Sequence, residues 1–158
     1  MRFRFRVSVA LALAAWLSSS MAFAQDPAKV ATKADVEKVT GQKFKDGSKP
    51  MPTQIAFSQD GGALTISVDI DPREADKTVR GWEATMKKMR PGAVVETVPG
   101  LGKDAIYYST RPDLGTVDAD FDRPRVQLRV SVGGAATPAQ AKQIAIDLAK
   151  IVGPRVGK

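Results

Sequence analysis

Histidine, cysteine and asparagine are all absent from this 158-residue chain. Without histidine or cysteine, Cys-His and Ser-His-Asp nucleophile arrangements cannot form, and zinc sites built on these ligands are excluded. Without asparagine the chain has no acceptor for N-glycosylation. Without cysteine, no disulfide supports the fold and no N-terminal cysteine can be lipidated. We therefore expect a protein that is not an enzyme and that holds no cofactor and no metal.

The N-terminal segment has the pattern of a secretory signal. Three arginines lie among residues 2–6, an apolar run covers residues 7–17, and Ala22-Phe23-Ala24 has the small-x-small form that signal peptidase reads. We expect a cleaved Sec-type signal peptide over residues 1–24 and a periplasmic or secreted mature chain that starts at Gln25. An uncleaved membrane anchor is disfavoured because the apolar run is too short for a span. No stable membrane insertion is expected after cleavage.

The mature chain is moderately basic. The signal holds three arginines and no acidic residue, so its removal lowers the net charge from +7 to +4. The basic residues do not cluster with aromatic ones, which argues against nucleic acid as a partner. A weak, salt-sensitive attraction to anionic envelope surfaces is still expected. We expect a flexible lead-in over residues 25–31, a single domain over 32–153 and a loose basic tail over 154–158.

Capping signals mark the first and last helices of the predicted domain. Thr32 can cap a short helix that carries Asp35 in its first turn, and Gly41 is a natural stop. A second capping motif begins at Thr137 and predicts a last helix that Gly153 ends.

The longest helix is predicted between these two. Asp71 is a good N-cap, Pro72 suits the first helical position, Glu74 closes a capping box, and Pro91 ends the helix. Apolar residues recur at steps of three and four and form a stripe that we expect to pack on a sheet. The alternative is a soft ligand pocket, for which the candidate residues are Trp82, Met86 and Met89.

Strand signals fill the rest of the domain. The stretch 42–53 is rich in lysine and proline and is interpreted as an exposed basic loop. Elsewhere, apolar residues alternate with polar ones, which indicates strands with one buried and one wet face. Strands are predicted over residues 55–59, 63–70, 93–98, 104–110, 116–121 and 125–132.

Acidic residues alternate along the strand predicted over 116–121. A hairpin turn at 122–125 would place Asp118 across from Arg129 as a small, exposed ion pair. Asp118, Asp120 and Asp122 resemble the first half of a calcium loop, but arginines stand where that loop needs glycine and glutamate. Calcium binding is therefore disfavoured. Carboxylate pairs at this spacing share a solvent face. Both groups ionise there, so they do not form a pair of general acid and general base.

The predicted domain is organised around the stretch 98–108. A strand arrives, a Pro-Gly-x-Gly corner turns it, and a second strand leaves with paired tyrosines. The two glycines permit positive φ, the leucine between them can enter the core or stay exposed, and the tyrosines must point to opposite faces. One tyrosine is expected in the core and one on the surface. The candidate contact surface is Gly100, Leu101, Gly102, Tyr107 and Tyr108.

The fold class that follows is α+β. We expect a mainly antiparallel sheet of about six strands, with the long helix and the C-terminal helix on one face and a short N-terminal helix. The leading Thr-x-x-Asp-Val helix, the Val-Pro-Gly-Leu-Gly-x-x-Ala-x-Tyr-Tyr corner and the Ala-rich last helix resemble small exported bacterial proteins of unknown function. Some of those are lipoproteins, with folds similar to the Mog1/PsbP type. The resemblance implies no catalytic residues, and this chain has no cysteine to lipidate.

Three classes of function remain open. The first is a non-catalytic exported domain that binds a protein or envelope component. The second is a small-ligand-binding protein with a pocket between the sheet and the long helix. The third, an enzyme that uses only carboxylates or lysine, is disfavoured because the acidic pairs are predicted on a solvated face. The oligomeric state does not follow from the sequence.

Overall fold

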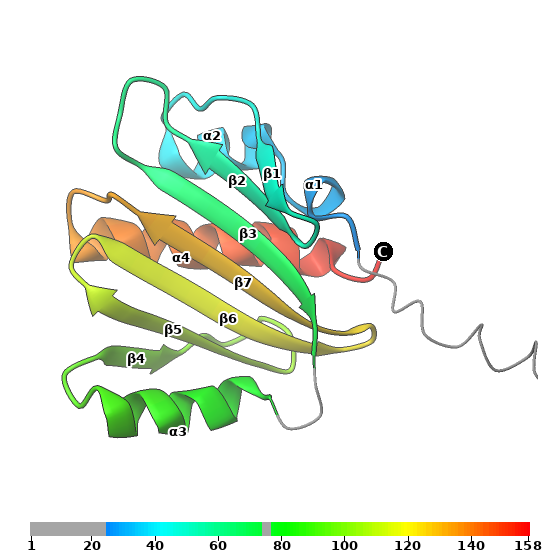
Figure 1. Cartoon of the computed structure of the whole chain (residues 1–158), viewed down its shortest axis with the longest axis vertical. Coiled ribbons are helices and arrows are strands. Elements are labelled where there is room, and N and C mark those ends of the chain that lie inside the picture. Colours follow the sequence, from blue (N-terminus) through cyan, green and yellow to red (C-terminus); the bar gives the residue numbers. More distant parts are fainter. Residues whose placement is uncertain (1–24, 74–76) are drawn as a thin grey trace, which may run out of the picture.

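The computed structural model describes residues 25–73 and 77–158, and within them the chain forms one α+β domain (Figure 1). The predicted signal peptide and Glu74, the predicted end of the capping box, lie outside the described residues. The strands are β1 (Ser48–Met51), β2 (Gln54–Ser58), β3 (Thr65–Pro72), β4 (Val94–Thr97), β5 (Asp104–Arg111), β6 (Leu114–Asp122) and β7 (Arg125–Gly133). The helices are α1 (Pro27–Val30), α2 (Lys33–Thr40), α3 (Val79–Met89), α4 (Pro138–Val152) and a 3-10 turn, η1 (Gly153–Arg155).

The described strands form a single antiparallel sheet in the order β1-β2-β3-β7-β6-β5-β4. The hairpin of β6 and β7 has the predicted register, with Asp118 opposite Arg129. In the hairpin of β2 and β3, Ile55 lies opposite Val68. The α+β class and the antiparallel sheet are therefore confirmed.

The main core lies between the sheet and α4, which runs behind the sheet in Figure 1. Alternation along the strands sends every second side chain to this face. On α4 the apolar residues follow the helical period, so that one stripe meets the sheet. The centre of this core is formed by Ile66, Val68, Val117, Leu128, Val130, Ala145 and Leu148.

A seventh strand, β1, forms at the edge of the sheet within the stretch 42–53 that was expected to be a loop. Its four residues are exposed, as the composition suggested. An edge strand tolerates Pro50 because its outer N–H groups need no partner, and Lys49 discourages further pairing at this edge. Low β propensity hid this strand from the sequence.

The two long helices lie on opposite faces of the sheet, which corrects the prediction that both cover one face. Tyr107 and Tyr108 point to opposite sides of β5. The Lys142 ammonium of α4 lies 5.8 Å from the centre of the Tyr107 ring, whereas Trp82 of α3 meets Tyr108 with ring centres 6.3 Å apart. Figure 1 shows α3 along the β4 end of the sheet, away from α4.

The start of α3 also differs from the prediction. Asp71 and Pro72 continue β3 and lie opposite Gln127 and Val126 of β7, so they do not begin a helix. The helix begins after Thr78, whose side chain accepts a hydrogen bond from the backbone of Gly81. Pairing with a neighbouring strand along the whole of β3 outweighs the local capping pattern, because tertiary contacts override weak local preferences.

Both ends of the described chain are part of the fold, whereas they were expected to be a flexible lead-in and a loose tail. Residues 25–31 contain α1, and Val30 is fully buried. In the tail, the Arg155 guanidinium donates two hydrogen bonds, of 2.5 and 2.8 Å, to the carboxylate of Asp35. The Gln25 side chain accepts a hydrogen bond from the Gly157 backbone at 2.7 Å and donates one to the Arg155 carbonyl.

We expect the Asp35–Arg155 pair to stabilise the fold in a pH-dependent way. Arg155 is the main cause that lowers the pKa of Asp35 from 3.8 to about 2. A depressed pKa gives stability that is present above pH 3.8 and is lost as the pH falls toward about 2. Asp35→Asn should therefore lower the free energy of unfolding by about 1–2 kcal/mol at pH 7, and by less near pH 2, in urea titrations.

A matched control is Asp46→Asn, which removes a carboxylate that pairs with Lys33 but is 96% exposed. Exposed ion pairs contribute little, so its effect should stay below about 0.5 kcal/mol. Equal effects of the two substitutions, or a cost at Asp35 that does not change with pH, would contradict the assignment.

Candidate functional site

The sheet face opposite α4 is polar along β3, β7 and β6. We call it the polar face, and it is the one turned toward the viewer in Figure 1. One row of side chains crosses it directly: Gln54 lies opposite Asp69, Asp69 opposite Arg129, and Arg129 opposite Asp118. A second row contains Asp71, Gln127, Asp120 and Asp104 on successive strands.

Asp118 and Arg129 form the centre of the polar face. The Arg129 guanidinium donates from Nε and Nη2 to the two carboxylate oxygens at 2.7 and 3.1 Å. Asp118 is 1% exposed. Its burial raises its pKa, and the bidentate hydrogen bonds from Arg129 oppose that rise. The same bonds raise the pKa of Arg129 further above its already high ordinary value. The pair was predicted to be exposed, and α3 is the element that the prediction did not place over it.

Asp120 joins the sheet to α3. Its Oδ2 atom accepts a hydrogen bond from the Val79 backbone N–H at 3.0 Å, and Arg73 Nη1 lies 3.1 Å from the same atom. Gln127 donates to Oδ1 at 3.3 Å. The carboxylate therefore satisfies the first turn of α3 and holds a buried guanidinium, which also pairs with Asp122. Within the described residues, Arg73 Nε is buried and has no hydrogen-bond partner.

A hollow lies between α3 and the polar face, and we call it the groove. Its volume is about 340 Å³. The α3 side supplies Thr78, Gly81, Trp82 and Thr85, the β7 side supplies Gln127 and Arg129, and Lys77 completes the lining. A second hollow, of about 460 Å³, shares Lys77 and Gln127 with the groove and is also lined by Asp71, Pro72 and Arg73. Polar groups and one large aromatic ring thus surround the groove.

The predicted pocket residues are not brought together. Trp82 lines the groove and is 37% exposed, with its ring meeting Tyr108 edge to face at an interplanar angle of 71°. Met86 is buried, as are Val79 of the same helix and Ile106 of β5. Met89 is 69% exposed at the end of the helix.

The predicted contact surface is not a single patch either. Gly100 and Gly102 are exposed and adopt positive φ, as the corner required. Leu101 is buried and fills the space beside Gly153 of the last helical turn. Tyr107 is buried toward α4, and Tyr108 is half-buried beside Trp82. Of the five residues, only Tyr108 lies near the groove.

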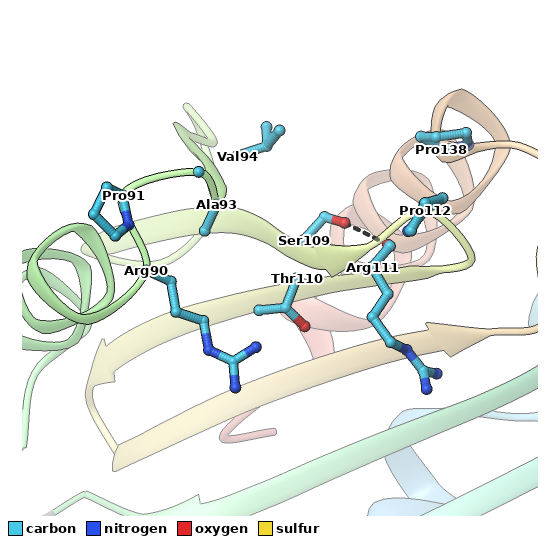
Figure 2. Close-up of a pocket in the computed structure, with 10 residues that line it drawn as sticks. Arg90, Pro91, Ala93, Val94, Ser109, Thr110, Arg111, Pro112 and Pro138 are labelled. Atoms are coloured by element: carbon cyan, nitrogen blue, oxygen red, sulfur yellow. Dashed lines mark hydrogen bonds between the residues drawn. The ribbon is translucent and has the colours of Figure 1, made fainter.

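The hollow in Figure 2 lies at the far end of α3 and has a volume of about 410 Å³. Three prolines are among its lining residues, and the side chains of Arg90 and Arg111 project to the same side (Figure 2). Both arginines are exposed, and Arg111 lies 3.3 Å from Asp113. Its lining contains no buried ionisable group, so this hollow lacks the fixed charges that distinguish the groove.

A scan of family models and searches of curated proteins and of solved structures find no match to this chain. The resemblance to exported Mog1/PsbP-like proteins therefore stays a prediction. Among the described residues, no helix is long and apolar enough to cross a membrane. No group of three carboxylates converges in the described part of the chain in a way that could hold a metal ion.

Sequence reasoning missed Arg73 and the burial of Asp118 and Asp120. The acidic alternation along β6 was visible, but alternation alone says which residues share a face and not whether a helix covers that face. The available signal for a buried polar cluster was the predicted register, which places two carboxylates opposite a basic and an amide residue.

We predict that loss of Arg129 destabilises the protein because Asp118 would stay buried without its partner. Arg129→Met should lower the free energy of unfolding by about 3 kcal/mol, the low end of the usual cost because the Arg129 side chain is 40% exposed. Arg125→Met, which removes an exposed arginine from the same strand, should have little effect. Adding Asp118→Leu to Arg129→Met should recover stability in chemical denaturation, and a further loss would contradict the assignment.

The two exposed glycines of the corner should differ in their tolerance of alanine. Both have positive φ, which costs an alanine about 1–2 kcal/mol. A Cβ at Gly100 would meet no atom within 4 Å, whereas a Cβ at Gly102 would lie 2.4 Å from the backbone oxygen of Asp120. Thermal unfolding should therefore show a clearly larger loss for Gly102→Ala than for Gly100→Ala. Equal losses would mean that the corner is not held against β6.

Proposed function

We propose that the protein is an exported, non-catalytic domain that binds a protein or envelope component on its polar face. The observation that carries this proposal is the cluster of buried ions beside the groove. Asp69, Asp118 and Asp120 are each less than 9% exposed. Buried ion pairs are poor stabilisers compared with apolar residues of similar size, and buried ionisable groups beside a hollow are typical of functional sites.

The bonding of these carboxylates supports a binding role over a catalytic one. Asp118 accepts both of its short hydrogen bonds from Arg129, and Asp120 accepts from a helix N–H and from Arg73. Groups held in this way orient the groove wall, whereas a general acid or base needs a proton within reach of a reacting group.

The export part of the proposal is supported by the sequence of residues 1–24. Cleavage after Ala24 would leave Gln25, which is the residue whose side chain holds the C-terminal turn at Gly157. The mature chain would then begin at a residue that contacts the C-terminal turn. We place the mature protein in the periplasm or outside the cell.

A second candidate function is a small-ligand-binding protein with a pocket between the sheet and α3. The volume of the groove favours it, since about 340 Å³ falls within the range of small-molecule sites. Trp82 and Arg129 would then contact the ligand from opposite walls.

A pair of substitutions with the same charge change tests the use of the polar face. Gln127→Lys adds a cation to the groove, where it can still reach Asp120. Gln143→Lys adds one to α4, where it can pair with Asp147. We expect immobilised mature protein to retain material from an envelope extract, and Gln127→Lys to reduce that retention at least fivefold while Gln143→Lys leaves it unchanged.

Equal retention by both variants would contradict binding on the polar face. Native mass spectrometry of the unmodified protein separates the two candidates. A macromolecular partner supports the first function, whereas a small bound mass alone supports the second.

A further inference from the structure

Trp82 presents a flat apolar surface inside an otherwise polar groove. Its ring meets Tyr108 edge to face, and more than a third of the residue stays exposed. An aromatic ring binds a flat apolar surface with little loss of side-chain entropy. Trp82 is also the only tryptophan of the mature chain.

The side chains around Trp82 are hydrogen-bonding groups of mixed kind. Thr78 and Thr85 carry hydroxyls, Gln127 carries an amide, and Arg129 carries a guanidinium. A ligand that suits this lining has one apolar face and a rim of donors and acceptors. A pyranose ring has this distribution, because its C–H groups gather on one face and its hydroxyls project from the edge.

Open donors on two arginines indicate the charge of the ligand. Arg129 commits Nε and one N–H of Nη2 to Asp118, which leaves the N–H groups of Nη1 on a side chain that is 40% exposed. Arg73 Nε is buried without an acceptor within the described chain, beside the second hollow. Such arginine donors favour a ligand that brings an anionic oxygen. Lys77 lines both hollows and adds to their positive charge.

We propose that the groove binds a sugar unit that carries a carboxylate, with the pyranose face against Trp82 and the carboxylate toward Arg129 and Lys77. This inference rests on the proposed function, because it assigns a ligand class to the same polar face. An acidic sugar is an envelope component, so a free sugar and a glycan chain share the chemistry that the groove recognises.

The test uses the mature protein and two sugars that differ by one carboxylate-bearing group. N-acetylmuramic acid carries a lactyl carboxylate, and N-acetylglucosamine lacks it. We expect the acidic sugar to change Trp82 fluorescence saturably and to bind at least about tenfold more tightly than the neutral one, since a charge-assisted hydrogen bond is lost with the carboxylate. This preference should weaken as the salt concentration rises.

A lysine pair localises the binding without disturbing the buried Asp118–Arg129 pair. Lys77→Gln removes a cation from the groove and should weaken binding of the acidic sugar at least fivefold. Lys150→Gln removes an exposed cation from α4, on the opposite face, and should leave binding unchanged. Isothermal titration on both variants gives a readout that does not depend on the tryptophan.

A disaccharide of the two sugars, titrated in parallel, distinguishes a free sugar from a glycan chain as the source. Tighter binding of the disaccharide supports a glycan, and equal binding supports the free acidic sugar. Equal affinity for the acidic and neutral sugars, no saturable binding of any of the three, or equal effects of the two lysine substitutions would overturn the inference. The proposed function fails separately, when Gln127→Lys and Gln143→Lys retain envelope material equally.

Discussion

The bidentate pair between Asp118 and Arg129 connects the register of the sheet to the chemistry of its polar face. The two residues lie directly opposite each other on β6 and β7, at the middle of the sheet. A slip of one residue would turn Asp118 toward α4 and move Val117 or Ala119 onto the polar face. Because a charge in the apolar core is far more costly than a lost packing contact, this pair penalises such a slip.

The alternation of side chains along the strands gives the sheet two different faces, and a different helix packs on each. On one face, α4 packs an apolar stripe against the full core. On the other, α3 buries Val79 and Met86, and Asp120 holds its first turn. Helices with few buried apolar contacts are among the first elements to open locally. The wall of the groove that α3 forms is therefore the more adaptable one, and the β7 wall is the rigid one.

Local patterns were enough to predict most elements but not the site. The cap at Thr32 and the positive φ of Gly100 depend on neighbours in the chain, and both occur as expected. Asp71 and Pro72 carry an equally good local signal for a helix start, yet β7 pairs with them and extends the strand. The groove depends on where α3 lies relative to the sheet. The apolar stripe was enough to identify Trp82 as a candidate pocket residue. The burial of Asp118 and the role of Arg73 were missed because they depend on this placement.

The buried ions of the polar face are costly as stabilisers, which supports the proposed binding role. The domain has no disulfide, so its stability depends on packing. Replacing Asp118 and Arg129 by apolar residues would avoid the cost of removing two charges from water. Within the described residues, Arg73 Nε has no acceptor, and the partly exposed Arg129 guanidinium lines the groove. A bound anionic oxygen would satisfy such donors, so the groove has its most favourable electrostatics when it is occupied.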